Sequence, residues 1–132
     1  MKNPFSIGHT LTIRHLVQPA DTAAFETGQV HPVYATFALA RDLEWAGRQF
    51  VLEMLDEDEE GIGTFLEIQH KSPALVGQEV TLTAMLLSVS GHEVICSIDA
   101  FVGDRCIATG KTGQKILKKE KISRIFTSIS HE

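Results

Sequence analysis

Cysteine is scarce in this sequence, and its spacing suggests neither a metal site nor a disulfide framework. Only Cys96 and Cys106 occur among the 132 residues, with no C-x-x-C pair and no nearby H-x-H. Zinc sites and disulfide frameworks need more ligands or more cysteines than this. We therefore expect two reduced thiols, no bound metal, no cofactor and a cytoplasmic protein.

Positive charge and long apolar runs are lacking as well. The 12 Lys and Arg against 17 Asp and Glu leave a net charge of -5, which argues against binding nucleic acid through its phosphates. No stretch reaches the roughly 18 apolar residues of a membrane helix, and the first residues do not resemble a signal peptide. With 43% hydrophobic residues and only four prolines, the composition predicts one domain over residues 1–132 with its own core.

Periodicity separates the first half of the chain into a strand, a loop and a helix. Alternation over residues 5–17 predicts a first strand. Proline and glycine in 18–35 predict a loop with at most a short element at Thr22–Phe25. Apolar residues then recur at helical spacing from Thr36 to Leu55, which predicts the principal helix. The acidic run 56–60 is expected to be a solvated turn.

Period-two alternation predicts about four consecutive antiparallel strands in the second half. The first of them follows residues 61–63 and carries His70 on the same face as Leu66 and Ile68. Residues 118–132 are expected to form a tail or a short edge element. This order of elements predicts an α+β fold, in which an antiparallel sheet of about five strands wraps around one long central helix.

Two tight turns define a predicted register for the later strands. A turn at Ser90–Gly91 would place Met85 opposite Cys96. A second turn at Gly103–Asp104 would place Cys96 opposite Lys111, so the two thiols should not be neighbours.

Three polar residues lie where the pattern predicts apolar ones or a helix start. Glu44 falls within the edge of the helical apolar stripe, and His70 falls on the core face of its strand. We expect these two to meet at the helix–sheet seam as an acid–base pair. Thr36 adds a hydroxyl at the helix start. From the pattern alone, a structural Glu–His hydrogen bond and an N-cap role for Thr36 are strong alternatives.

Four short motifs, within roughly residues 30–115, carry a family resemblance. They are Ala35-Thr36, Leu43-Glu44-Trp45-Ala46, Gly61-Ile62-Gly63-Thr64 and Ile68-Gln69-His70. Together they resemble the hotdog-fold thioesterases of the fluoroacetyl-CoA thioesterase type. In that family a threonine, a glutamate eight residues on and a histidine 26 residues further form the catalytic set, and Thr36, Glu44 and His70 reproduce both spacings.

The resemblance implies a hotdog domain that hydrolyses a small acyl-CoA thioester to the free acid and coenzyme A. It implies a catalytic set of Thr36, Glu44 and His70, in which Glu44 attacks the carbonyl or deprotonates a water. It also implies a homodimer, or a tetramer, with active sites at the seam between subunits. Since Thr36 and Glu44 would lie about 12 Å apart along one helix, Thr36 must sit on a bent helix start or act with Glu44 of a second subunit.

Further residues are expected to contact the substrate. Gly63 matches the family's glycine whose backbone N–H lies near the reacting carbonyl, and Tyr34 and Phe37 are expected nearby. Gln114 stands where the fluoroacetyl-specific enzyme has an arginine, which argues against fluoroacetyl specificity. The alternative function is a non-catalytic hotdog module that binds acyl-CoA or another apolar small molecule. A hotdog hydratase is disfavoured because the Asp and His pairing of that family is not found.

Overall fold

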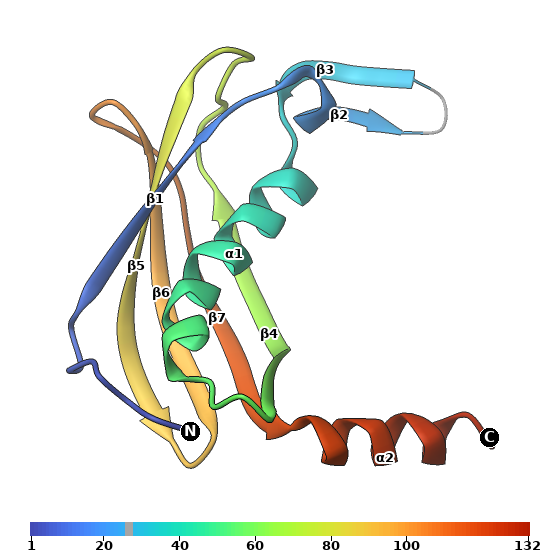
Figure 1. The fold of residues 1–132 in the computed structure, drawn as a ribbon. Coiled ribbons are helices and arrows are strands. Elements are labelled where there is room, and N and C mark those ends of the chain that lie inside the picture. Colours follow the sequence, from blue (N-terminus) through green and yellow to red (C-terminus); the bar gives the residue numbers. More distant parts are fainter. Residues whose placement is uncertain (26–27) are drawn as a thin grey trace.

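The computed structural model describes residues 1–25 and 28–132. Figure 1 shows one long helix lying against a five-stranded antiparallel sheet of order β1-β5-β6-β7-β4, with a two-stranded sheet at one end. The elements in chain order are β1 (Thr10–Leu16), the short 3-10 helix η1 (Pro19–Asp21), β2 (Thr22–Phe25), β3 (Gly28–Tyr34), α1 (Thr36–Met54), β4 (Glu59–His70), β5 (Glu79–Ser90), β6 (Glu93–Val102), β7 (Arg105–Lys118) and α2 (Lys119–Ile129). The predicted α+β architecture is confirmed.

The helix α1 forms because its apolar residues recur on one face, and that face fills the hollow of the sheet. Leu39, Leu43 and Phe50 are fully buried there, and each such side chain contributes about 1.5–3 kcal/mol. The approach to β7 is close: a Cβ on Gly47 would collide with the Thr112 side chain, and one on Gly110 would lie 2.5 Å from Leu43 Cδ2. Glycine at these two positions therefore lets α1 settle onto the sheet.

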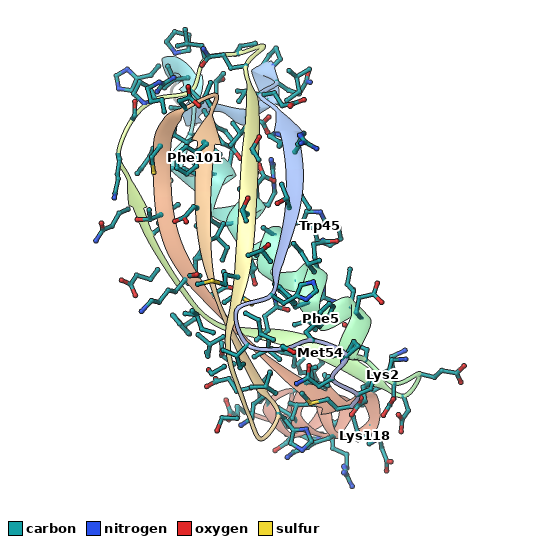
Figure 2. All side chains as sticks on the ribbon, turned by 90° about the vertical axis from the view of Figure 1, so that its left-hand side faces the viewer. Lys2, Phe5, Trp45, Met54, Phe101 and Lys118 are labelled. Carbon is teal, nitrogen blue, oxygen red and sulfur yellow. The ribbon has the colours of Figure 1, made fainter. Side chains whose placement is uncertain are left out.

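The N-terminal segment covers the end of α1. Figure 2 shows Phe5 beside Met54 at this end of the molecule, and the Phe5 ring meets Phe50 edge-on with centroids 4.9 Å apart. The Lys2 amide donates to the Met54 carbonyl at 2.9 Å, which satisfies one of the free carbonyls at the helix terminus.

The acidic run after α1 is not a fully solvated turn, and that expectation is wrong. Glu59 begins β4 and is only 3% exposed. The Met1 amine lies 2.8 Å from its carboxylate and also pairs with Asp56. The hydrogen bond with this amine lowers the pKa of Glu59. A positive charge therefore lies at the negative end of the helix dipole, where the acidic run alone would be unfavourable.

The stretch 18–35 is not a loop around one short element, as expected, but contains a hairpin. Strands β2 and β3 pair with irregular register, and residues 26–27 of the predicted loop lie outside the described residues. The end of β3 is held to the body of the protein, since the Tyr34 amide donates to the Ala74 carbonyl at 2.8 Å. Where the pairing of two strands is irregular, successive side chains do not alternate strictly between the two faces. The sequence of this stretch therefore lacks the regular alternation of apolar and polar residues that predicts a strand.

The register between β5 and β6 also differs from the prediction. Ser90 pairs with Glu93, so the turn residues are Gly91 and His92, with Gly91 at a φ of +61° that favours glycine. A β-bulge then places Cys96 opposite Leu86 instead of Met85.

The second turn lies at Gly103–Asp104 as predicted, with Val102 opposite Arg105. A further bulge shifts Cys96 to face Thr112 instead of Lys111. Both cysteines are free thiols, as expected. Each bulge adds one residue to one strand, which a count of residues from the turn cannot detect.

The C terminus forms the helix α2 instead of a tail or a short edge element. Its apolar residues, Ile122, Ile125, Phe126 and Ile129, recur at helical spacing. Within the described parts of the chain, no helix has the length and apolar character needed to cross a membrane.

A polar cluster around the buried carboxylates of Asp21 and Asp42 joins the hairpin region to α1. Asp21 accepts hydrogen bonds from His15 at 2.7 Å and from Arg41 at 2.9 Å. Arg41 also binds Asp42 at 3.0 Å, and the Tyr34 hydroxyl donates to Asp42. Burial alone would raise the pKa of Asp21, but hydrogen bonds from the Gln18 amide, Arg41 and His15 outweigh it and lower that pKa. The cluster therefore depends on a charged Asp21.

We expect stability to fall in acid partly through Asp21. Folding lowers the pKa of Asp21, so this residue contributes to the free energy of unfolding at pH values above its unfolded-state pKa of about 3.9. The contribution is lost as the pH falls through the pKa that Asp21 has in the folded protein. Asp21→Asn should cost about 1–3 kcal/mol of unfolding free energy at pH 7 and flatten the decline between about pH 5 and 2. Urea unfolding over that range measures both effects. The exposed Asp104→Asn is the control, and equal slopes for the two variants would contradict the assignment.

Candidate active site

A threonine and a histidine meet where α1 begins and β4 ends. Thr36 is the first residue of α1, after the N-cap Ala35, and His70 is the last residue of β4. A hydrogen bond of 2.9 Å joins Thr36 Oγ1 and His70 Nδ1. The other ring nitrogen, Nε2, is buried and has no hydrogen-bond partner among the described residues. The pair combines a hydroxyl with an imidazole, the side chain that most often transfers protons in general acid–base catalysis.

Glu44 lies two turns further along α1, against the backbone of β4. A Cβ placed on Gly63 would lie 2.5 Å from Glu44 Oε1, so the carboxylate occupies space that only glycine leaves free. The side chain of Glu44 is exposed, so the expectation that it lies on the buried side of the helix, within the edge of the apolar stripe, is wrong. At the edge of the apolar stripe, a small rotation of the helix decides whether a side chain such as that of Glu44 is buried or exposed.

The structure joins His70 to Thr36 and not to Glu44. Among the described residues no hydrogen bond connects Glu44 with His70, so the predicted carboxylate–imidazole pair is not formed within one chain. Thr36 is not an N-cap either, since it lies inside the helix and its hydroxyl is directed to the histidine. The separation of eight positions from Thr36 to Glu44 corresponds to about 12 Å along the helix axis.

A surface hollow adjoins Glu44 on the outer side of α1. Its volume is about 340 Å³, and it is lined by Arg41, Asp42, Glu44, Trp45 and Arg48. This volume is at the lower end of the roughly 300–1,000 Å³ of small-molecule sites. Arg41 and Arg48 give the hollow two cationic groups beside the carboxylates of Asp42 and Glu44.

Arg48 connects the hollow to the strand below it. Its guanidinium donates to Gln114 Oε1 at 3.2 Å, to the Gly61 carbonyl at 3.2 Å and to Glu60 at 2.6 Å. Gln114 is 2% exposed and pairs with Gly63 across the sheet, so it lies beneath the site and not at its surface. Sequence reasoning missed Arg48, although its place one turn after Glu44 on α1 was a usable signal.

The two aromatic residues expected near the substrate have different environments. Phe37 follows Thr36 and is 52% exposed. Tyr34 is fully buried, with its hydroxyl donating to Asp42, so it lies behind the site and does not reach its surface. Burial and the neighbouring carboxylate raise the pKa of Tyr34, which keeps the phenol protonated. Asp42 is buried as well, and its residue type gave no sequence signal of this burial.

An antiparallel sheet curled around one helix is the hotdog architecture. A hydroxyl–imidazole pair at the end of the edge strand and a carboxylate on the helix give it the groups that acyl transfer requires. The fold is therefore that of the hotdog proteins, and its helix–sheet seam carries polar groups of the kind that a hotdog thioesterase would need.

Comparison with known proteins gives the family. The chain matches the sequence profile of the fluoroacetyl-CoA-specific thioesterases over residues 17–120, and it belongs to that family. It is 26% identical over 129 residues to the fluoroacetyl-CoA thioesterase of Streptantibioticus cattleyicolor, and this match covers 93% of each chain. The protein is therefore a thioesterase, a hydrolase acting on acyl-CoA, as the sequence predicted.

Two solved structures are similar over nearly the whole chain. A thioesterase superfamily member from Thermus thermophilus superposes with a TM-score of 0.91 and 35% identity, covering 97% of this chain and 95% of that one. A phenylalanine-to-alanine variant of the fluoroacetyl-CoA-specific thioesterase, in complex with fluoroacetate and CoA, superposes with a TM-score of 0.80 and 26% identity. It covers 89% of this chain and 99% of that one.

Proposed function

We propose that this protein hydrolyses a small acyl-CoA thioester and that Thr36, Glu44 and His70 form its catalytic set. The observation that carries the proposal is the 2.9 Å hydrogen bond between Thr36 Oγ1 and His70 Nδ1. It joins residues 34 positions apart that the sequence had singled out together with Glu44. The hollow of about 340 Å³ beside Glu44 suits a short acyl group.

In this mechanism Glu44 is the group that acts on the thioester carbonyl. As a general base it takes a proton from a water while the water oxygen bonds to the carbonyl carbon. The tetrahedral intermediate then collapses, the carbon–sulfur bond breaks, and the proton passes to the departing thiolate of coenzyme A. In the alternative route a Glu44 oxygen bonds to the carbonyl carbon, the carbon–sulfur bond breaks, and coenzyme A leaves as a thiolate that takes up a proton. Water then adds to the Glu44 carboxyl carbon of the resulting anhydride, which releases the free acid and restores Glu44. His70, oriented by Thr36, supplies or holds a proton near the reacting atoms.

The substrate-side roles follow from the positions of the other residues. We propose that the Gly63 N–H donates to the carbonyl oxygen, since a β-bulge between Gly63 and Phe65 interrupts the ladder beside it. Phe37 would contact the acyl group from its exposed position on α1. Gln114 supports the site from below through Arg48, at 3.2 Å.

We further propose that the protein is a homodimer paired through β4. This strand lies at the edge of the sheet, and its Phe65 and Leu66 are 42% and 41% exposed. An unpaired edge of this length is a template for a second strand. Gly63 lies against Glu44 of α1 and His70 against Thr36 of α1, and the two are seven residues apart on β4. Antiparallel pairing about the midpoint between Leu66 and Glu67 sets Gly63 of one chain opposite His70 of the other.

Such a dimer assembles the catalytic set from two chains. Glu44 lies against Gly63 of its own chain, and Thr36 is bonded to its own His70. Pairing Gly63 with His70 of the other chain brings each carboxylate to the other chain's hydroxyl–imidazole pair. This removes the separation of about 12 Å that two helical turns impose within one chain.

We assign the protein to the cytoplasm. Its two cysteines carry free thiols, which suits a reducing compartment. Burial raises the pKa of Cys96 to about 12, so this thiol stays protonated and unreactive.

Thiol release from a panel of acyl-CoAs, from acetyl to long chain, tests the proposed activity. We expect turnover of the short members, with kcat/KM falling as the chain outgrows the hollow. Binding of one member without turnover of any would instead assign the protein as a non-catalytic acyl-CoA-binding module.

A further inference from the structure

The helix α2 presents an apolar face that its own chain does not cover. None of its residues, all of which are described, is buried. Phe126 is 61% exposed, Ile129 53% and Ile125 40%, and all three lie on one face. Its attachment to the body is at its first residue, where the Lys119 amide donates to the Asp58 carbonyl at 2.8 Å.

A helix of this length and exposure needs a partner. Isolated helices shorter than about 12–15 residues are marginal in water, because too few hydrogen bonds offset the cost of nucleation. The helix has 11 residues. Most helical stability in proteins comes from packing an apolar face, and this face is fully formed in α2.

The position of α2 identifies what covers it. Figure 1 shows α2 and the β2–β3 hairpin extending past β4 on the same side, away from the remaining strands. In Figure 2, after a turn of 90°, both lie on the far side of the sheet. The two are tied to opposite ends of β4: α2 lies beside Asp58 at its start, and the hairpin leads through Tyr34 to Thr36 beside His70 at its end.

We propose that α2 packs against the β2–β3 hairpin of a second copy of this chain. The inference rests on the dimer of the proposed function. In antiparallel pairing of β4 with itself, the start of one strand lies beside the end of the other. Each α2 then meets the partner's hairpin. The symmetric dimer contains this contact two times, so the apolar face of Ile125, Phe126 and Ile129 is covered in both subunits. Because β3 leads directly into Thr36, this contact also steadies the start of α1.

Cross-linking between two different variants tests the contact. One variant carries Phe126→Cys and the other Pro32→Cys, both in a Cys106→Ser background that removes the partly exposed native thiol. We expect a covalent dimer on a non-reducing gel when the two are mixed and oxidised. Each variant alone should give at least tenfold less, since the two α2 helices of the dimer are far apart. Replacing Pro32→Cys by Asp104→Cys, in the turn between β6 and β7, is the position control.

A second measurement uses charge to disrupt the contact. The double variant Phe126→Glu and Ile129→Glu should weaken dimerisation by tenfold or more in sedimentation equilibrium, whereas Ser123→Glu in the same helix should not. A wild-type monomer would overturn the proposed dimer and this contact with it. A wild-type dimer with no mixed cross-link, or with unchanged affinity in the double variant, would overturn only the contact. Binding of α2 to anionic vesicles with unchanged dimerisation would assign it to a lipid surface instead.

Discussion

Replacing Glu44 by glutamine is expected to lower kcat for acyl-CoA hydrolysis by about 10²–10⁴-fold. The amide keeps the size of the side chain but can neither accept a proton from water nor attack the carbonyl. Because Glu44 is exposed and makes no buried ion pair, the free energy of unfolding should change by less than about 0.5 kcal/mol. Thiol release and urea unfolding of the same preparation measure the two quantities.

Glu53→Gln is the matched control for this variant, since Glu53 is an exposed carboxylate on the same helix. Full activity of both variants would remove Glu44 from the mechanism. Single turnover in ¹⁸O-labelled water separates the two proposed routes. A general base leaves one ¹⁸O in the acid released in the first turnover, whereas direct attack followed by water addition at the Glu44 carboxyl carbon leaves ¹⁸O on Glu44 and an original Glu44 oxygen in the acid.

Replacing Gly63 by alanine should lower kcat/KM by at least about tenfold, a loss of roughly 1.4 kcal/mol of transition-state stabilisation. The new Cβ would lie 2.5 Å from Glu44 Oε1, so the carboxylate must move away from β4. A displacement of about 1 Å at a reacting group can lower the rate of the chemical step by about 100-fold. The measurement is the kinetic comparison of the variant with the wild type on the best substrate of the panel.

Gly61→Ala is the comparison for this effect. A Cβ on Gly61 would lie 2.6 Å from the Val51 side chain, and so it should reduce stability through overpacking. The folded fraction should lose less of its kcat than Gly63→Ala does, because this Cβ meets Val51, Arg48 and Gln114 and not Glu44. If Gly63→Ala and Gly61→Ala lost activity in parallel with stability, the space beside Glu44 would have no special role.

The elements that could be predicted were those with an uninterrupted local period. The helix α1 was expected over 36–55 and ends at Met54, because its buried face repeats over five turns without a break. The hairpin β2–β3 and the register of β5, β6 and β7 were not, since bulges and irregular pairing each insert a residue that leaves no mark in composition. The helix α2 had the right period, but the charged residues at its start suggested a solvated tail.

In the candidate site too, the sequence predicted which residues take part, but it did not predict which of them are in contact. Residue type and spacing selected Thr36, Glu44 and His70, because polar groups stand out against an apolar pattern and against a family's motif. Their pairing depends on how α1 lies across β4. That placement follows from the close contacts at Gly47, Gly63 and Gly110, each made between residues far apart in the chain.

Sequence alone therefore determined the fold class, the long helix and the three polar residues, since these follow from local periodicity and from short motifs. Tertiary packing determined that the imidazole binds a hydroxyl, that the carboxylate faces outward over Gly63, and that Tyr34 lies behind the site. Contacts of this kind depend on long-range register and on the rotation of a helix by a few tens of degrees. No local pattern of residues encodes either quantity.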